Sequence, residues 1–499
     1  MNTHFASFAA LPAIAVASLL QVTVAAEPVA YFRADAGVAV GSQALPDKLD
    51  PSTQLWRTEL APGHSTPCIT ADSIFVTTFE KKDSPKAEAS KSEPPQGELA
   101  TVAIDRATGQ VRWRQVAPVA RAIEAYHPTG SPAASSCASD GKRVYSFFGS
   151  YGLLCYDLAG QLLWSKPMEP FQDEFGSGSS PILVDGKLIL NEDHDRDSFI
   201  MAVDGATGEV LWKTPRDGFT RSYATPVVAT LAGKKQIIVA GALQLVAYDV
   251  ETGKQLWSRD GLARIVNTTP VVADDQLYVA TWSPGGDTEA RASMEPWDVA
   301  VKQWDKNGDN RLSRDEVNNP DVLDRFFRID LDQNKGLDEA EWKKYARVFE
   351  LAKNSIQVFR PKPGPSGGTG ETTQMEVVWQ HQKGLPYVSS PLTYQKVVYL
   401  AKDGGILTTL DAESGKPLKT GRLPGAGNYM ASPVAGDGKI YLASVAGHVT
   451  VLEAGPKWSV LNSHDFAERI VASPVIADGR IFLRTEQALY CFAAKKPVP

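Results

Sequence analysis

The feature that most restricts the fold of this chain is a Ser/Thr-Pro dipeptide that recurs before short apolar runs. It occurs in the segments STPCIT, GSPAAS, SSPILV, ATPVVA, TTPVVA, SSPLTY, ASPVAG and ASPVIA. Most copies lie about forty to fifty residues apart, and a period in the forties with several short strands per unit is typical of propeller blades. The prolines of these copies are Pro67, Pro132, Pro181, Pro226, Pro270, Pro391, Pro433 and Pro474.

A second signature is a hairpin whose turn reads Asp-x-x-Thr-Gly and whose outgoing strand carries a tryptophan, as in AIDRATGQVRW, AVDGATGEVLW and AYDVETGKQLW. The Asp side chain can accept backbone N–H groups in such a turn, and Gly supplies the positive φ. We expect the tryptophans to pack between neighbouring blades rather than on a ligand. They are Trp113, Trp212 and Trp257, with Trp164 after a shortened turn and Lys419 in the equivalent place of the sixth repeat.

These repeats predict an all-β chain folded as an eight-bladed β-propeller of four-stranded antiparallel blades. The last repeat supplies only three strands. The segment TQLWRTEL around Trp56, which precedes the first repeat, can provide the fourth. Its pairing with ALYCF would close the ring and cover both sheet edges.

The Asp-x-x-Thr-Gly-x-x-x-Trp hairpin resembles the repeats of pyrroloquinoline-quinone-type propellers. Such repeats occur in quinone-dependent alcohol dehydrogenases and in outer-membrane-assembly propellers of the BamB kind. The resemblance extends over nearly the whole chain after its N-terminal segment. It implies the fold but no single function, because the fold serves both classes. It also implies that pockets lie on the face where the loops between second and third strands emerge.

Two insertions interrupt the repeats, both between the second and third strands of a blade. The first, at 81–98, is polar, charged and rich in Pro, so we expect a disordered loop. The second, at 284–354, carries helical signals and acidic loops within blade five. The remaining boundaries are a signal peptide at 1–26 and propeller segments at 27–283 and 355–499. We expect the helical module to stand over the mouth of the central channel.

Two acidic loops in the second insertion match the calcium-loop spacing of ligands at positions 1, 3, 5, 7, 9 and 12. Two consecutive matches favour an EF-hand pair that binds two calcium ions; magnesium is a weaker candidate, and acidic helix caps that bind nothing are the alternative. The sixth position, normally Gly, is Asn310 and Lys335, and the left-handed backbone there costs Lys roughly 1 kcal/mol. The expected ligands are Asp305, Asn307, Asp309, Arg311 (through its carbonyl), Ser313 and Glu316 in the first loop, and Asp330, Asp332, Asn334, Gly336 (through its carbonyl), Asp338 and Glu341 in the second.

The N-terminal segment predicts export. An apolar run is followed by the small residues VAA before Glu27, as in a secretory signal, although no Lys or Arg precedes the run. We expect a periplasmic or extracellular protein with no transmembrane span after cleavage; a retained anchor is the alternative. Export permits a Cys68–Cys137 disulfide, and otherwise the four cysteines are buried small side chains. A formal charge of −7 argues against a nucleic-acid partner.

Polar residues before the Ser/Thr-Pro motifs, and the NEDHDRDS segment of the third repeat, are candidates for the channel mouth. Arginines at similar repeat positions could bind an anion, and the acidic and histidine side chains could hold a metal or exchange protons. Alternatively, these charges pair with one another and hold the blades in register. The candidates are His64, His127, Asp193, His194, Asp195, Arg221, Arg264, Tyr387, Tyr429 and Arg469.

Two functions follow from these patterns. The first is a non-catalytic binding or scaffold protein that takes an unknown protein or a small anionic ligand at the mouth, with calcium ordering the insertion. The second is a pyrroloquinoline-quinone-dependent alcohol or sugar dehydrogenase. The resemblance to such enzymes implies a vicinal Cys pair and a catalytic Asp, but the chain has no adjacent cysteines and no catalytic residue can be assigned. We therefore favour the first function, and calcium over the quinone as cofactor.

Overall fold

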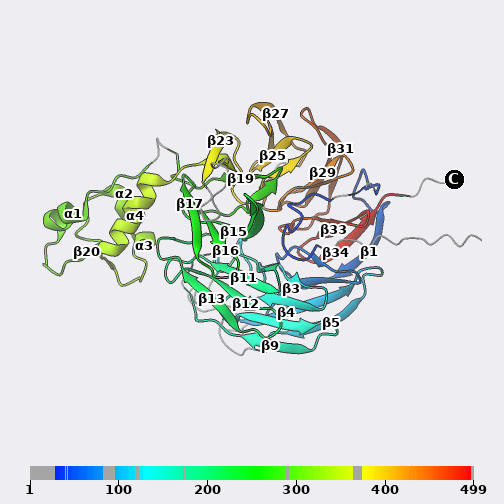
Figure 1. The fold of residues 1–499 in the computed structure, drawn as a ribbon, viewed down its shortest axis with the longest axis horizontal. Helices are drawn as coiled ribbons and strands as arrows, with labels where there is room; N and C mark the ends of the chain where they lie inside the picture. Colours follow the sequence, from blue (N-terminus) through cyan, green and yellow to red (C-terminus); the bar gives the residue numbers. More distant parts are fainter. Residues whose placement is uncertain are drawn as a thin grey trace, which may run out of the picture.

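A ring of eight four-stranded antiparallel sheets surrounds a central channel, which confirms the predicted propeller (Figure 1). The computed structural model describes residues 29–39, 41, 43–82, 96–118, 123–124, 126–171, 173, 175–287, 291–362, 374–425 and 427–495. The expected signal peptide and residues 83–95 of the first insertion lie outside these ranges.

The first four blades run in simple order from the inner strand to the outer one. Blade one comprises β2 (Cys68–Ile69), β3 (Ser73–Lys81), β4 (Gly97–Asp105) and β5 (Val111–Val116). Blade two comprises β6 (Ala138–Ser139), β7 (Arg143–Phe147), β8 (Leu153–Asp157) and β9 (Leu162–Lys166), with a 3-10 turn at Gly149–Tyr151. Blade three comprises β10 (Ile182–Val184), β11 (Lys187–Glu192), β12 (Phe199–Asp204) and β13 (Val210–Pro215). Blade four comprises β14 (Val227–Leu231), β15 (Lys234–Ala240), β16 (Gln244–Asp249) and β17 (Gln255–Asp260).

The last four blades include the interrupted one and the closing one. Blade five comprises β18 (Val271–Ala273), β19 (Gln276–Thr281), β22 (Ser355–Pro361) and β23 (Met375–His381). Blade six comprises β24 (Leu392–Tyr394), β25 (Val397–Lys402), β26 (Ile406–Asp411) and β27 (Pro417–Arg422). Blade seven comprises β28 (Val434–Gly436), β29 (Lys439–Ala443), β30 (His448–Glu453) and β31 (Ser459–Asp465). Blade eight comprises β32 (Val475–Ala477), β33 (Arg480–Arg484) and β34 (Ala488–Ala493), completed by β1 (Gln54–Glu59) with Trp56 opposite Cys491.

The tryptophans of the hairpin motif pack between blades, as predicted. The Nε1 of Trp113 donates to the Leu158 carbonyl, 2.9 Å away, in the turn of the next blade. Trp212 makes the same contact with the Val250 carbonyl at 3.1 Å. Trp257 differs, because its Nε1 donates to Gln236 of its own blade. In the sixth blade the Lys419 ammonium lies 4.0 Å from the ring centroid of Trp458, so a cation replaces the missing indole.

The second repeat departs from the sequence alignment. Ser136, rather than Ser131, accepts the hydrogen bond from the Thr66 N–H, and Cys137 therefore takes the place of the motif proline. Pro132 belongs to the loop before it. The number of repeats is right, but this copy was misaligned by sequence because a second Ser-Pro precedes the structural position.

The N-terminal segment 29–39 runs across one end of the channel. Val29 bridges to Ile69 of blade one and Val38 to Ala435 of blade seven, while Tyr31 packs against blades three and four. Arg33 is buried, and its guanidinium donates to the Pro391 carbonyl at 2.8 Å and the Pro433 carbonyl at 3.2 Å. This segment therefore covers the end opposite the loops that join second to third strands.

Four short helices and a two-stranded ribbon lie between β19 and β22. They are α1 (Trp297–Trp304), β20 (Leu312–Ser313), α2 (Pro320–Leu323), α3 (Phe326–Ile329), β21 (Gly336–Leu337) and α4 (Glu339–Leu351). Figure 1 shows these helices beside the ring and not across its centre, which differs from the expected position over the mouth. The reason is that α4 and the residues that follow it contact blades three and four. Lys344 donates to the Asp195 carbonyl, and Arg347 lies 3.9 Å from Asp260. Beyond α4, the Lys353 N–H donates to the Leu262 carbonyl.

The Cys68–Cys137 disulfide is not formed, and all four cysteines are free and buried. Both side chains belong to one apolar cluster with Phe75 and Leu154. The Sγ of Cys137 contacts the Ser146 hydroxyl instead. Burial raises the pKa of Cys137 to about 11, so this thiol is a packing group rather than a nucleophile.

No helix among the described residues combines the length and the apolar composition needed to cross a bilayer.

Candidate functional site

The central channel contains a cavity of about 240 Å³ to which every blade contributes. Its wall is built from the segments around the Ser/Thr-Pro motifs, because these segments begin the innermost strands. Phe32 of the N-terminal segment forms part of its floor. Two of the sequence candidates, His64 and Tyr387, belong to this wall.

A belt of hydroxyl groups surrounds this cavity. The hydroxyl at the start of one blade accepts a hydrogen bond from the backbone N–H at the same place in the preceding blade, at 2.9–3.1 Å. Seven of the eight steps around the ring have this bond, and they fix the blades at the same height. The accepting hydroxyls belong to Thr66, Ser136, Ser180, Thr225, Ser390, Ser432 and Ser473.

The lining of this cavity is uncharged among the residues that the structure describes. It contains no Arg, Lys, Asp or Glu there. Its one titratable base, His64, is neutral at pH 7, because burial and the nearby Arg469 and Arg484 lower the pKa of its imidazole to about 3. The polar groups that face the cavity are therefore hydroxyls, amides and backbone.

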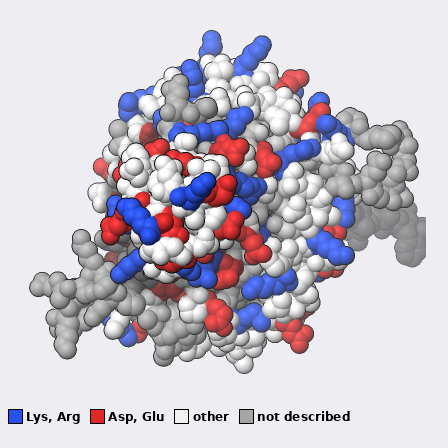
Figure 2. All heavy atoms as spheres, turned by 90° about the vertical axis from the view of Figure 1, so that its left-hand side faces the viewer, with Lys and Arg blue, Asp and Glu red and all other residues white. Residues whose placement is uncertain are grey.

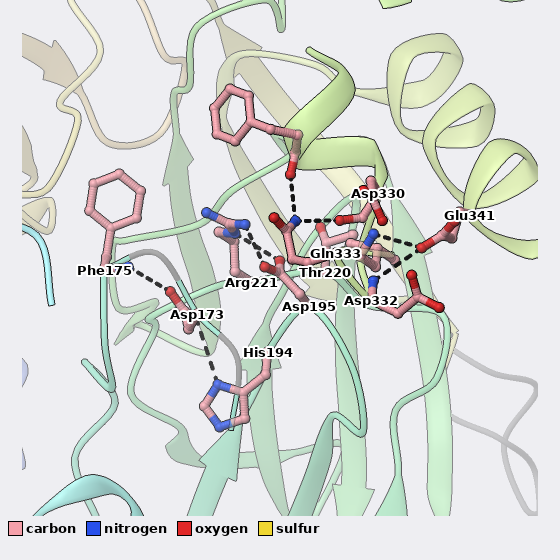
Figure 3. Close-up of polar contacts among 12 residues, drawn as sticks. Asp173, Phe175, His194, Asp195, Thr220, Arg221, Asp330, Asp332, Gln333 and Glu341 are labelled. Atoms are coloured by element: carbon pink, nitrogen blue, oxygen red, sulfur yellow. Dashed lines mark hydrogen bonds and ion pairs between the residues drawn. The ribbon is translucent and has the colours of Figure 1, made fainter. Parts of the chain in front are cut away.

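Two buried ion pairs hold the mouth together between blades three and four. Asp193 and Arg216 form a bidentate pair at 2.6 and 2.8 Å with both side chains fully buried. Asp195 accepts from the Arg221 Nε at 2.7 Å (Figure 3). The Asp195 carbonyl also accepts from Lys344 of α4 at 3.3 Å. These aspartates are therefore engaged with arginines of their own region.

His194 is buried between two carboxylates. Its Nδ1 lies 3.7 Å from Asp173 (Figure 3). Its Nε2 lies 3.0 Å from Glu192, and its ring stacks on Phe171 with the centroids 4.1 Å apart. Burial alone would lower the pKa of the imidazole, but the hydrogen bonds and charges of Asp173 and Glu192 outweigh burial and raise it to about 10. His194 is thus a buried cation at neutral pH.

A second cavity of about 90 Å³ lies where the insertion meets the mouth. Arg328 and Tyr345 line it from α3 and α4, and Arg221, Arg264 and Tyr387 line it from the propeller. The Nε of Arg264 donates to the Pro284 carbonyl at 2.8 Å. Three guanidinium groups gather at this junction. Burial, followed by the charge of the neighbouring Arg328, lowers the pKa of Arg264.

The remaining mouth candidates lie elsewhere. His127 bonds Thr129 at 2.7 Å and packs on Phe175. Tyr429 is buried in the apolar core of blades six and seven. Arg469 donates to the Thr129 carbonyl at 3.0 Å. The three arginines at similar repeat positions therefore do not converge on one point, since Arg469 lies in neither cavity lining.

The two acidic loops of the insertion share one backbone conformation. Each has positive φ at its fourth position (Gly308 and Gln333) and again at its sixth (Asn310 and Lys335). Their eighth residues, Leu312 and Leu337, are buried and pair in the β20–β21 ribbon. The side chains of the first and twelfth residues turn inward and accept backbone N–H groups of their own loop.

In the second loop three carboxylates converge. Oxygen atoms of Asp330, Asp332 and Glu341 all lie within 4.8 Å of one another. Glu341 accepts from the Leu331 and Asp332 N–H groups at 2.7 and 3.1 Å (Figure 3). Burial, followed by the neighbouring carboxylates Asp332 and Asp338, raises the pKa of Asp330 and Glu341 respectively.

The first loop holds its last carboxylate differently. Glu316 accepts from the Ser313 hydroxyl at 2.7 Å and the Ser313 N–H at 2.9 Å. The hydrogen bond from the Ser313 hydroxyl is the main cause of the lowered pKa of Glu316. Asp305 accepts from Gly308 and Asn310 N–H groups at 2.7 and 2.9 Å. Among the described residues, only the second loop gathers three carboxylates within 4.8 Å of one another.

A tryptophan cluster makes the insertion a compact unit. Trp342 of α4 is fully buried between Trp297 and Trp304, with ring centroids 5.9 Å away in both cases. Leu243 of the propeller packs in the same cluster and joins the insertion to blade four. Figure 2, which looks onto the insertion, shows Lys and Arg interspersed with Asp and Glu rather than a surface of one sign.

Sequence reasoning missed several residues of this region. Asp173, Glu192, Arg216 and Tyr223 carry the buried charge network, yet only Glu192 stands within the NEDHDRDS neighbourhood that drew attention. In seven repeats the belt position is the Ser or Thr before the motif proline, and in the second it is Ser136 before Cys137; the sequence pattern indicated only the start of a strand. Its repetition at one place in each blade was the signal that could have identified it.

The comparisons with known proteins agree with this architecture. A family model described as outer membrane protein assembly factor BamB matches residues 47–215, 96–307 and 371–496. The chain belongs to this BamB family. The solved BamB of Moraxella catarrhalis superposes with a TM-score of 0.53 at 13% identity, covering 90% of this chain and 99% of that one.

Other similar proteins are dehydrogenases by name. A polyvinylalcohol dehydrogenase of Sphingopyxis sp. (strain 113P3) is 27% identical over 244 residues, which is 46% of this chain and 32% of the relative. The chain thus spans about a third of that relative's length. The quinohemoprotein alcohol dehydrogenase of Comamonas testosteroni superposes with a TM-score of 0.52 at 12% identity, covering 91% of this chain and 79% of that one. At such identities the superpositions show the propeller fold alone.

The channel cavity does not fit pyrroloquinoline quinone. This cofactor carries three carboxylates, and buried carboxylates require cationic partners or a metal. The described lining offers neither a cation nor acidic ligands for a metal. The arginines of the second cavity lie outside this lining, in a space of only about 90 Å³.

Proposed function

We propose that this protein is an exported, calcium-binding β-propeller of the BamB family that acts as a non-catalytic binding or scaffold protein. The observation that carries the proposal is the convergence of Asp330, Asp332 and Glu341 in a loop whose backbone is repeated in a second loop nearby. Two loops with the same turns and the same ribbon contact support the proposal of an EF-hand pair.

Calcium suits these loops because every side-chain ligand offers oxygen. The first loop would contribute Asp305, Asn307, Asp309, Ser313 and Glu316, and the second Asp330, Asp332, Asn334, Asp338 and Glu341. Asp338 and Glu341 also form a capping box at the start of α4, which supports the alternative of a metal-free helix cap. The convergence of three carboxylates favours a cation, because a helix cap needs only Asp338 and Glu341 and leaves the like charges of Asp330 and Asp332 beside them.

Calcium in the second loop would fix the contact between the insertion and the propeller. Arg328 precedes this loop on α3, and Tyr345 lies one turn beyond Glu341 on α4. Both side chains line the cavity at the mouth. The ion would thereby order the face that meets a partner protein, or a small anion that approaches Arg264.

Calorimetry tests the calcium proposal. We expect two calcium ions per chain with Glu341→Gln and Glu316→Gln each removing one, and magnesium binding more weakly. Failure of calcium to bind, or to raise the melting temperature, would reject it. Export is tested by sequencing the N-terminus of the protein from the periplasmic or medium fraction, where Glu27 is expected as the first residue.

A quinone-dependent alcohol or sugar dehydrogenase is the second candidate. The similarity to two proteins named as dehydrogenases favours it, and the uncharged channel lining opposes it. A dye-linked oxidation assay with added pyrroloquinoline quinone and calcium separates the two. Turnover of an alcohol or sugar would replace the scaffold proposal, whereas the scaffold proposal predicts none.

A further inference from the structure

The hydroxyl belt of the channel has unused hydrogen-bond donors. Each of its seven accepting hydroxyls receives one backbone N–H, and a hydroxyl carries one proton to donate in addition. None of the seven donates to an acceptor among the described residues. All seven line the cavity of about 240 Å³. The belt therefore presents a circle of O–H donors to whatever occupies the channel.

Two buried arginines beside the cavity direct their guanidinium groups to backbone carbonyls. The guanidinium of Arg484, behind the wall, donates to the Ser65 carbonyl at 3.0 Å and the Thr77 carbonyl at 2.7 Å. Arg33, beneath the floor, is held by the Pro391 and Pro433 carbonyls. A charged ligand would thus be desolvated without a direct counter-ion, which costs several kcal/mol. An uncharged ligand with acceptor oxygens has no such penalty.

Aromatic rings complete the wall. Phe175, Tyr223 and Tyr387 line the same cavity, and the Tyr223 hydroxyl is already bonded to Asp173 at 2.6 Å. Their exposed ring surfaces suit the C–H faces of a sugar or a polyol. The opposite end of the channel is covered by the N-terminal segment, so a ligand enters from the face that carries the insertion.

We propose that the channel cavity binds an uncharged, polyhydroxyl ligand of about monosaccharide size. The ligand's oxygens accept from the hydroxyl belt, and its apolar face lies against the aromatic rings. The inference rests on the proposed function, in which this face is the binding face, and it assigns the chemistry of the ligand. A cavity of about 240 Å³ is below the ~300–1,000 Å³ of drug-sized sites, which limits the ligand to small molecules.

The test is calorimetric titration of the full mature chain with D-glucose, sorbitol, D-glucuronate and pyrroloquinoline quinone as probes. Each titration is made with calcium and with chelator, and calcium binding is measured on the same sample. The variant is Thr225→Val with Ser390→Ala, which removes two belt hydroxyls. Thr450→Val is the matched control, because Thr450 is a buried hydroxyl of blade seven outside the cavity. Melting temperatures show that each variant is folded.

We expect saturable binding of glucose or sorbitol, at least about tenfold tighter than glucuronate. The double variant should weaken it about tenfold, the combined effect of two hydrogen bonds, while the control leaves it unchanged. Tighter binding of glucuronate or the quinone, or an equal loss of affinity in the control, overturns the inference. The absence of saturable binding of the uncharged probes also overturns it and means that the belt holds only water. If the double variant does not fold, Tyr387→Ala replaces it with the same expectation. Loss of calcium binding with retained sugar binding rejects the calcium proposal alone.

Discussion

The channel mouth and the loops of the insertion are both rich in acidic side chains, but the two regions compensate these negative charges differently. At the mouth, Asp193 and Asp195 each have an arginine, and His194 lies between two carboxylates. In the second loop, Asp330, Asp332 and Glu341 face one another and accept mainly from backbone N–H groups. Charges that are paired within the chain hold structure, whereas converging like charges require a cation from solution.

The largest effect is expected where a buried pair is broken. Asp193→Asn leaves the Arg216 guanidinium buried without its counter-ion, so the free energy of unfolding should fall by about 3–5 kcal/mol. Urea unfolding measures the change with and without calcium, and it should be the same in both. The control is Asp185→Asn, which removes an exposed pair with Lys235 and should cost less than about 1 kcal/mol. Equal losses in the two variants would mean that the mouth pair is not structural.

Removal of calcium should have the next largest effect. At a calcium concentration of about 100 times the dissociation constant, binding to the native state stabilises it by roughly 2.7 kcal/mol. Chelation should therefore lower the melting temperature and change the fluorescence of the cluster around Trp342. Glu341→Gln should remove the part of this response that comes from the second loop, and Glu316→Gln the part that comes from the first. A wild-type response that both variants retain would contradict calcium binding in these loops.

The charge of His194 should make the mouth sensitive to alkaline pH. Its folded-state pKa of about 10 is above the unfolded value, so its contribution to stability is fully present below about pH 6.5 and is lost as the pH rises through 10. The effect is smaller than that of Asp193→Asn because a neutral imidazole still donates to one carboxylate. Melting temperatures of wild type and His194→Gln should differ most below pH 6.5 and converge towards pH 10. A difference that is independent of pH would exclude a buried imidazolium.

The smallest effect is expected at the sixth position of the second loop. Lys335 has φ of +74°, so Lys335→Gly should relieve about 1 kcal/mol of backbone strain and tighten calcium binding by up to about fivefold. Asn310→Gly is the matched change in the first loop and should have little effect, because Asn enters this region more readily. Calorimetry distinguishes the two. An unchanged affinity in Lys335→Gly would show that strain at this position does not limit binding.

The propeller could be predicted from sequence because its signals are local. The Asp-x-x-Thr-Gly turns and their tryptophans lie within single hairpins, and the eight Ser/Thr-Pro copies give the number of blades. The pairing of Asp193 with Arg216 could not be predicted, since a 23-residue separation along the chain says nothing about which arginine lies nearest. The sequence also does not predict that the N-terminal segment closes one end of the channel and places Phe32 in the cavity floor. Nor does it predict that Cys137 occupies the position that proline has in the other repeats. The insertion was expected over the channel, but the contacts of Arg347 with Asp260 and of Lys353 with Leu262 hold it at the side.

The candidate ligands of the acidic loops could be predicted from spacing, since the ligand positions of such a loop lie within twelve consecutive residues. Spacing does not predict how deeply these carboxylates are buried. The raised pKa values of Asp330 and Glu341 arise from their packing between α3 and α4, which depends on the tryptophan cluster. For the channel, the sequence drew attention to charged residues, whereas the cavity wall consists of the hydroxyls that begin each blade.

The most direct test of this account is a crystal structure of the mature protein grown with calcium, with anomalous diffraction used to locate the ions. The account predicts two peaks, one inside Asp305–Glu316 and one inside Asp330–Glu341, with Glu341 bound through both oxygens. Peaks at neither loop, in a protein whose insertion is ordered, would contradict it.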